Sequence, residues 1–322
     1  MNTNQELIDK IKLLGYTVRQ IGYRDQAQAD KNEYNYRYWI IPEENSLLKD
    51  TPFYHDSEND FIHFTSLEAL YGILNSKHLR LYNLLNMDDK YELGYAKKSL
   101  SFLSSDKESE DKEGLYAMSF CSSLVVLNEE PKKKKHLLWK LHGRDGHGVI
   151  IRFKIYNDLS TWYNFYLAKC FYDLDNFYAI KELNEVTDKE ILDAKLGCFI
   201  KLPIYEFENE IRLVFDKRHS GWIDDKNGKR VYPLIYPDKL NTSDKIYYFQ
   251  LPLYNFFKDN PDAYPTPPNG MQRPHEIPKI GITEIILGYR YNEADLLNLR
   301  TRMELIDPTI VIKLSDLRQF YS

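Results

Sequence analysis

Three acidic residues alternate along the segment Tyr205–Phe215, at Glu206, Glu208 and Glu210. The apolar residues between and after them recur at multiples of two, a pattern that predicts a β-strand. In such a strand the three carboxylates and Arg212 would share one face, and neighbouring carboxylates repel unless a cation or a ligand offsets them. The segment is therefore a candidate active-site strand. The alternative is an edge strand whose charged face is simply exposed to water.

A second candidate is His63-Phe64-Thr65, a short strand end that leads into the helix start Thr65-Ser66-Leu67-Glu68, in which Thr65 or Ser66 is the N-cap. An imidazole and a hydroxyl at this place can hydrogen-bond a ribose, and the helix amides favour a nearby phosphate. The alternative is a half-buried histidine beside an ordinary helix cap. Ser119, on the predicted strand 116–122, could face a nucleotide or fill a gap in the core.

Two polar loops complete the candidates. The first, residues 86–92, carries Asn86, Asp88 and Glu92, which could bind a polar ligand, although an aspartate there also suits the cap of the next helix. The second is the lysine run 132–135, expected on a loop, where Lys133 and Lys134 could contact phosphates or remain solvated.

Composition and absent motifs exclude several classes of protein. Dinucleotide-binding glycine motifs, P-loops, nucleophile elbows and HExxH metal sites are absent. The three cysteines are widely spaced and do not form metal-ligand pairs, so a disulfide framework and a zinc site are not expected. The net charge is -5, and the sequence shows neither a secretory leader nor a long apolar run. We expect a cytoplasmic protein with no membrane segment and no metal.

The elements that must position these residues alternate between strands and helices, which indicates an α+β chain. Residues 1–60 are expected to be an N-terminal addition, 61–215 the core, and 216–322 an extension that completes the same domain. Strands are predicted at 17–23, 34–41, 61–64, 78–83, 116–122, 149–155, 205–215, 284–287 and 309–312. Helices are predicted at 5–15, from 67 onward, at 90–104, around 137–141, at 183–202 and at 292–304.

The order of the motifs resembles a known group of proteins. His-Phe-Thr-Ser at 63–66 is followed by Asn-x-Asp-x-x-x-Glu at 86–92, Ser-Phe-Cys-Ser at 119–122, a Trp139 block with glycines, and Glu208-x-Glu210-x-Arg212. This series is similar to a bacterial family of domains of unknown function with HYTS, NDxxE and ExExR blocks. That family occurs in phage-defence and toxin loci and resembles DarT-type ADP-ribosyltransferases. The resemblance covers about residues 61–215.

The resemblance implies a fold and a site. The implied fold is an ADP-ribosyltransferase-like core of two small, packed, mostly antiparallel sheets that hold NAD between them. In its chemistry Glu210 stabilises the cationic ribose and Glu208 deprotonates the acceptor. The residues implied to bind NAD are His63, Thr65, Ser119, Asn86 and Arg212. Those implied in substrate or loop contacts are Asp88, Glu92, Trp139, Lys133 and Lys134.

The implied function is an NAD-dependent ADP-ribosyltransferase, a toxin or anti-phage effector that modifies RNA or DNA, as a CmdT-like toxin does, and that an antitoxin protein could restrain. Two alternatives remain: hydrolysis of NAD without a macromolecular acceptor, and a non-catalytic sensor or interaction module. The sequence departs from the family at His142, where tyrosine is usual, and at Gly146, where histidine is common. Asn-Met-Asp-Asp also replaces the usual Asn-Asp-Pro.

Overall fold

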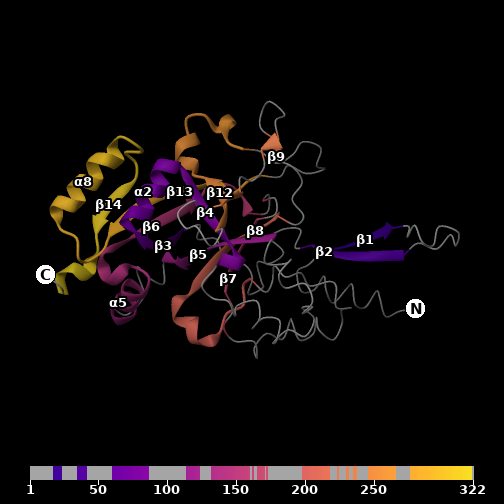
Figure 1. Cartoon of the computed structure of the whole chain (residues 1–322), viewed down its shortest axis with the longest axis horizontal. Helices are drawn as coiled ribbons and strands as arrows, with labels where there is room; N and C mark the ends of the chain where they lie inside the picture. Colours follow the sequence, from indigo (N-terminus) through magenta and orange to yellow (C-terminus); the bar gives the residue numbers. More distant parts are fainter. Residues whose placement is uncertain are drawn as a thin grey trace.

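The computed structural model describes most of the predicted core and C-terminal region (Figure 1). The described residues are 17–23, 35–41, 60–86, 114–123, 132–159, 162, 165–170, 172, 198–217, 223–224, 230–231, 235–237, 246–265 and 276–320. Two short antiparallel pairs stand apart from the main sheet in their pairing: β1 (Thr17–Tyr23) with β2 (Asn35–Ile41), and β9 (Ile223–Asp224) with β10 (Arg230–Val231).

A ten-stranded mixed sheet forms the centre of the molecule, in the order β11-β12-β4-β5-β3-β6-β13-β14, with β8 and then β7 continuing from β5. Every pairing is antiparallel except that of β13 with β14. The strands are β3 (Asp60–Ser66), β4 (His78–Asn83), β5 (Leu115–Ser122), β6 (Gly148–Ile155), β7 (Phe165–Lys169), β8 (Glu210–Asp216), β11 (Ile235–Pro237), β12 (Tyr247–Pro252), β13 (Ile280–Leu287) and β14 (Val311–Leu314).

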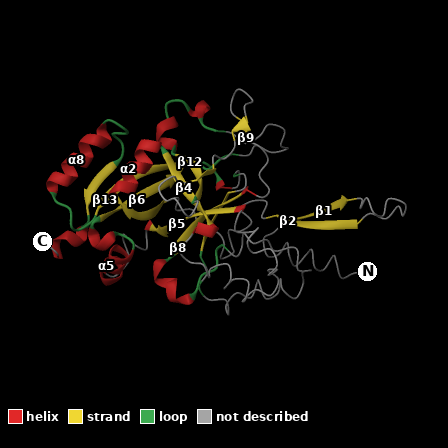
Figure 2. Cartoon of the chain, viewed as in Figure 1, coloured by secondary structure: helices red, strands yellow, loops and turns green. Residues whose placement is uncertain are grey.

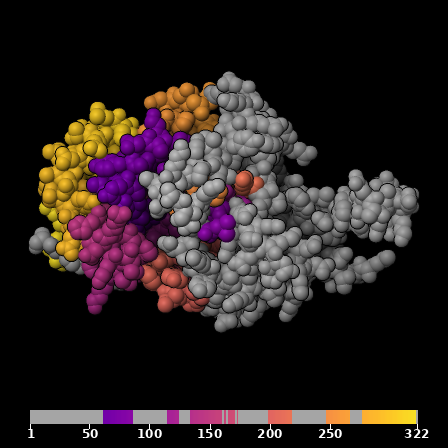
Figure 3. Space-filling view, in the orientation of Figure 1, coloured from indigo at the N-terminus to yellow at the C-terminus, as the bar shows by residue number. Residues whose placement is uncertain are grey.

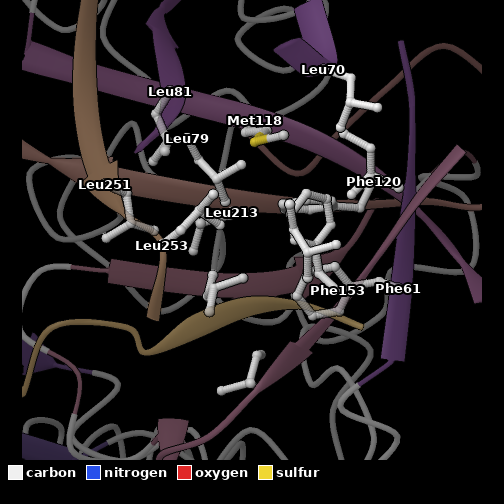
Figure 4. Close-up of a cluster of buried hydrophobic side chains, with 14 of the residues drawn as sticks. Phe61, Leu70, Leu79, Leu81, Met118, Phe120, Phe153, Leu213, Leu251 and Leu253 are labelled. Atoms are coloured by element: carbon white, nitrogen blue, oxygen red, sulfur yellow. The ribbon is translucent and has the colours of Figure 1, made fainter. Parts of the chain in front are cut away.

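The sheet nearly closes on itself around one apolar core. A parallel bridge between Leu253 and Ile280 joins the end of β12 to the start of β13, so the path β12-β4-β5-β3-β6-β13 returns to its beginning. The enclosed side chains, which we call the main core, include Leu81, Met118 and Phe153 (Figure 4). The chain is thus α+β with a large mixed sheet and few helices. Two separate small sheets were expected, but β5 pairs with β3 and β4 and also with β8, which joins these strands in one sheet.

The helices lie at the periphery of the strands (Figure 2). They are α2 (Leu67–Ser76), α5 (Lys132–Leu141) and α8 (Glu293–Glu304), with short 3₁₀ turns η2 (Leu84–Asn86), η5 (Arg144–Gly146), η7 (Pro203–Glu208), η9 (Tyr254–Phe257), η10 (Pro261–Ala263) and η11 (Asp316–Phe320). None of the helices in the described part of the chain is long and apolar enough to cross a bilayer. α2 begins where expected, because the Ser66 hydroxyl accepts a hydrogen bond from the amide of Ala69 at 3.0 Å.

A smaller cluster, here the second core, covers the outer face of the sheet beside α5. It contains Trp139 and Leu138 of α5, which pack on Ile62, Phe64 and Ile150 of the sheet. Phe64 and Trp139 meet edge to face with ring centroids 5.3 Å apart. This packing fixes α5 on the same face of the sheet that carries the alternate residues of β5 and β8.

The predicted strand 205–215 is wrong in its first half. Residues Pro203–Glu208 form the 3₁₀-helix η7, and Asn209 adopts a left-handed conformation (φ 43°, ψ 50°) that turns the chain before β8 begins at Glu210. Proline at a helix start and asparagine in a left-handed turn are both favoured placements. Phe207 consequently packs against the second core rather than on the main-core face of β8.

The other predicted elements fare unevenly. Strands are present at 17–23, 35–41, 60–66, 78–83, 115–122, 148–155, 280–287 and 311–314, and α8 occupies the predicted helix 292–304. The lysine run is not on a loop, because Lys132 begins α5. Residues 198–202, the described end of the predicted helix 183–202, are not helical. The predicted helices 5–15 and 90–104 lie outside the described residues.

Candidate active site

One edge of β5 is shared by two strands that separate from each other. β3 pairs with β5 only at Phe61–Ser122 and Ile62–Cys121, and β4 pairs with it only at Tyr82–Ala117 and Asn83–Tyr116. Among the described strands, none pairs with residues 118–120 on this edge. On this edge, the backbone of the intervening part of β5 is therefore available for contact with side chains instead of pairing with a neighbouring strand. We call this place the β5 branch.

His63 reaches across the β5 branch. Its Nδ1 lies 2.9 Å from the carbonyl oxygen of Ser119, and because a carbonyl only accepts, Nδ1–H is the donor. Burial is the main effect on the His63 pKa and lowers it; the bond to Ser119 opposes this, and the nearby His142 adds to the lowering. The imidazole is thus favoured in its neutral form, with Nε2 as its acceptor nitrogen.

On the opposite edge of β5, β8 places Glu210 beside Cys121 and Arg212 beside Ser119. Glu210 is only 4% exposed. Its Oε1 accepts hydrogen bonds from Nε and Nη2 of Arg212, each at 2.8 Å, and its Oε2 lies 2.6 Å from Nζ of Lys201. The Ser119 side chain is close enough to the Glu210 carboxylate to help lower its pKa. His63 and Glu210 are therefore connected through a single residue of β5.

Glu208 joins the same cluster from η7. Its Oε2 accepts from Lys201 at 2.8 Å, and its Oε1 lies 3.2 Å from Nε2 of His142, the residue that follows α5. Lys201 therefore bridges the two carboxylates, and Arg212 completes the balance: two acids face two cations, with His142 at the outer end. We call Lys201, Glu208, Glu210 and Arg212, together with His142, the carboxylate cluster.

The electrostatics keep both carboxylates ionised. Burial raises the pKa of Glu210, but the charges of Arg212 and Lys201 outweigh it, so the pKa lies below its ordinary value. For Glu208, burial again raises the pKa, and the hydrogen bonds from His142 and Lys201 bring it below the ordinary value. For Lys201, burial lowers the pKa, but the charge of Glu210 and the hydrogen bonds to both carboxylates raise it by more, so the amine remains charged.

Tyr172 and Cys198 make further hydrogen bonds to the residues of the cluster. The Tyr172 hydroxyl accepts a hydrogen bond from the Glu210 amide at 2.8 Å, and Arg212 Nη1 donates to the Cys198 carbonyl. Cys121 is a buried free thiol. Its burial, with the charge of Glu210 beside it, raises the pKa far above the usual range. A thiol in this state does not act as a nucleophile near neutral pH.

The remaining predicted site residues lie apart from the cluster or outside the described residues. Trp139, predicted to make a substrate or loop contact, is 1% exposed within the second core. Thr65 lies further along β3, opposite Val149. Lys133 is exposed and Lys134 half-buried on α5. The Asn86 side chain, Asp88 and Glu92 lie outside the described residues.

Sequence reasoning missed Lys201 and gave His142 no role in the site. A charge count contained a partial signal, since Glu208 and Glu210 together need more than one cation if both are buried. Lys201 lies seven and nine residues before them, and because the chain changes from η7 to β8 in between, no single periodic element relates the three and the pattern alone could not select that lysine. His142 follows a helix whose docking on the sheet is set by tertiary packing.

Other parts of the described chain offer less chemistry. No group of three potential metal ligands occurs among the described residues. A surface hollow of about 510 Å³ lies between α2 and α8 and shares no residue with the carboxylate cluster. It is lined by Leu67, Tyr71, Leu287, Asp295, Asn298, Leu299, Thr301 and Arg302.

No protein-family model, curated protein or solved structure matches the chain. The fold and the geometry of the site must therefore be interpreted on their own. What they provide is a buried pair of ionised carboxylates held by two cations, connected through Ser119 to a neutral histidine at a branch of the sheet.

Proposed function

We propose that this protein is an NAD-dependent ADP-ribosyltransferase whose carboxylate cluster is the catalytic centre. The supporting observation is the convergence of His63, Ser119 and Glu210 at the β5 branch, three residues that lie 56 and 91 positions apart in the sequence. These are the residues that the motif resemblance assigns to the ribose, the nicotinamide and the reacting sugar. The proposed core is accordingly ADP-ribosyltransferase-like.

The charge state of Glu210 suits the chemistry. Cleavage of the bond between nicotinamide and ribose passes through a cationic, oxocarbenium-like sugar, which an adjacent fixed carboxylate stabilises. Glu210 is ionised because Arg212 and Lys201 lower its pKa, and the same two contacts fix its position. A preorganised carboxylate needs little rearrangement as the positive charge develops, which is the source of its catalytic effect.

The fit to NAD depends on hydrogen-bonding capacity at the β5 branch. With Nδ1–H committed to the Ser119 carbonyl, the His63 ring offers Nε2 as an acceptor for a ribose hydroxyl. Ser119 and Arg212, side by side on β5 and β8, would hold the nicotinamide end next to Glu210. NAD is here a substrate, and its binding can be measured without any turnover.

For the acceptor we propose a nucleic acid, RNA or DNA, and for the biological role a toxin or anti-phage effector. α5 carries five lysines and no acidic residue, in a chain whose net charge is -5. Lys133 and Lys140 are exposed. Lys135 instead forms an ion pair with Asp316, with 3.0 Å between Nζ and Oδ2. α5 (magenta) adjoins η7 (salmon), which carries Glu208, at the surface shown in Figure 3, so phosphates on this helix would approach the cluster.

The test is transfer from labelled NAD to RNA, DNA and protein acceptors, with wild type compared with Glu210→Gln. We expect the substitution to reduce transfer by about 10²–10³-fold, the usual effect of removing one group that stabilises the transition state. Glu206→Gln is the matched control, because Glu206 is an exposed glutamate of η7. NAD should raise the melting temperature of all three proteins, since binding to the native state stabilises it.

Each outcome selects one function. Free ADP-ribose as the sole product would replace the transferase with an NAD glycohydrolase. A wild-type protein that neither binds nor consumes NAD would overturn the proposal and leave a non-catalytic interaction module. If toxicity to the producing cell survives in Glu210→Gln while NAD turnover is lost, the toxicity does not depend on this chemistry.

A further inference from the structure

His142 occupies a defined position at the outer end of the carboxylate cluster. It follows α5 directly, and its backbone amide donates to the Leu138 carbonyl at 2.8 Å. Its ring lies 6.4 Å, centroid to centroid, from that of Phe64, which is part of the second core. The side chain is 39% exposed. The imidazole is thus held on one side by packing and is accessible on the other.

Glu208 orients this imidazole. Its Oε1 lies 3.2 Å from Nε2 of His142, and because Glu208 is ionised, its charge favours a proton on that nitrogen. In a neutral histidine this arrangement leaves Nδ1 as the nitrogen that can take a proton. The other oxygen of Glu208 is fixed by Lys201 at 2.8 Å, so the carboxylate cannot turn away without losing a charged hydrogen bond.

Glu208 itself is a poor proton acceptor in this setting. One oxygen is occupied by Lys201 and the other by His142, and together they hold its pKa below the ordinary range. A general base works best when it titrates near the operating pH, which a stabilised carboxylate does not. A carboxylate that orients an imidazole toward a reacting group is, in contrast, a recurrent arrangement in nucleophile activation.

We propose that His142 is the general base that activates the acceptor and that Glu208 is its positioning residue. This inference rests on the proposed function and assigns a class of substrate: a nucleophile with an N–H or O–H group, such as a base amine or a sugar hydroxyl of a nucleic acid. In the step, Nδ1 of His142 takes the acceptor proton, and the acceptor atom forms a bond to the ribose C1′. The bond from C1′ to nicotinamide breaks, and its electron pair leaves with the now neutral nicotinamide.

The location supports this division of roles. Glu210 is almost fully buried and faces Lys201 and Arg212, whereas His142 faces Glu208 from η7 and is close enough to His63 of β3 to affect its pKa. The reacting sugar would thus lie inward and the acceptor outward, at the end of the lysine-rich helix α5. A macromolecule could reach His142 without entering the buried part of the cluster.

The first test compares His142→Gln with wild type and with His136→Gln, a substitution on α5 at a histidine whose ring lies 5.6 Å from that of Tyr289. We expect kcat for transfer to fall by about 10²–10⁴-fold in His142→Gln, as for loss of a general base. The KM for NAD and the dissociation constant of NAD, measured by calorimetry, should stay within about two-fold, as effects of less than half a kcal/mol. Exogenous imidazole should partly restore transfer in His142→Ala and not in Glu210→Gln.

A second readout needs no turnover. In the neutral form of the His142 ring, nitrogen NMR should show the proton on Nε2 and not on Nδ1, and Glu208→Ala should abolish this preference. Transfer by His142→Gln within about three-fold of wild type would overturn the base assignment alone, as would parallel loss of NAD binding and transfer. A wild-type protein without any nicotinamide release would overturn the proposed function and this inference together.

Discussion

At the scale of single residues, Lys201 is the centre of the site. Its ammonium contacts Glu208 at 2.8 Å and Glu210 at 2.6 Å, and the residue is buried. Two carboxylates in this position could not both remain ionised without it, because Arg212 compensates only one negative charge. Lys201 therefore helps to keep both Glu208 and Glu210 ionised.

Replacing Lys201 by methionine should destabilise the native state strongly. Removal of one partner from a buried ion cluster leaves an uncompensated charge and costs about 3–5 kcal/mol, measured by urea unfolding. The matched control is Lys279→Met, which breaks a partly exposed pair with Glu276 at 2.9 Å and should cost less than about 1 kcal/mol.

The double substitution Lys201→Met with Glu208→Gln removes the one negative charge left in surplus by the loss of the lysine and should recover part of the lost stability. Equal effects of Lys201→Met and Lys279→Met on the free energy of unfolding would mean that the cluster is solvated and that Lys201 does not hold it.

At the scale of elements, the site depends on how α5 ends. Gly143 follows His142, and its α-carbon lies against Trp139, so that an added β-carbon would collide with the indole ring and sit 2.9 Å from the Trp139 carbonyl oxygen. Trp139 is itself fixed in the second core. The end of α5, and with it the position of His142, is set by this close approach.

Gly143→Ala should therefore destabilise the protein by about 1–3 kcal/mol, the usual cost of overpacking a well-filled core. Gly72→Ala is the matched control, because it lies inside α2 with no atom within 4 Å of the added carbon. It should stabilise by about 0.5–1 kcal/mol, since alanine favours a helix. Thermal unfolding of both variants checks the pair, and a neutral Gly143→Ala would contradict the proposed packing.

At the scale of the whole molecule, several ionised carboxylates link stability to pH. Asp307 is the clearest: it accepts hydrogen bonds from Asn255, Lys258 and Thr309, joining η9 to the turn between α8 and β14. Burial raises its pKa, but the bonds from Thr309 and Asn255 outweigh this and lower the pKa to about 2 from an ordinary value of 3.8.

A lowered native pKa contributes stability above the unfolded value, and this contribution is lost as the pH falls through the native one. Asp307→Asn should accordingly cost about 2 kcal/mol at neutral pH, the typical loss of hydrogen bonds to a charged group. The difference from wild type should shrink between about pH 4 and pH 2, measured by urea unfolding at each pH. Asp262→Asn, at an exposed site on η10, is the matched control and should change the free energy of unfolding by less than about 0.5 kcal/mol at neutral pH.

The fold was predictable where local pattern and tertiary environment agree. The alternating or continuous apolar runs of β3 to β6 and β13 are long enough to specify strands, and Ser66 marked the start of α2. The segment 205–215 misled because the spacing of Phe207, Ile211 and Leu213 satisfies a strand even though Phe207 packs elsewhere. Pro203 and Asn209 were the local signals of the turn. Which cations would reach Glu208 and Glu210 depended on contacts that no local pattern encodes.

The pairing of distant strands has a consequence for synthesis. β4 finds its partner β12 about 170 residues later, and β6 finds β13 about 130 residues later. While the ribosome is still translating the segment that follows β8, the carboxylate cluster can already be complete in sequence, yet β4 and β6 each lack one of their two neighbouring strands. The nascent chain therefore cannot close its sheet until β13 has emerged. A prematurely terminated chain would expose open strand edges, the usual substrate of chaperones and proteases, instead of leaving an active fragment.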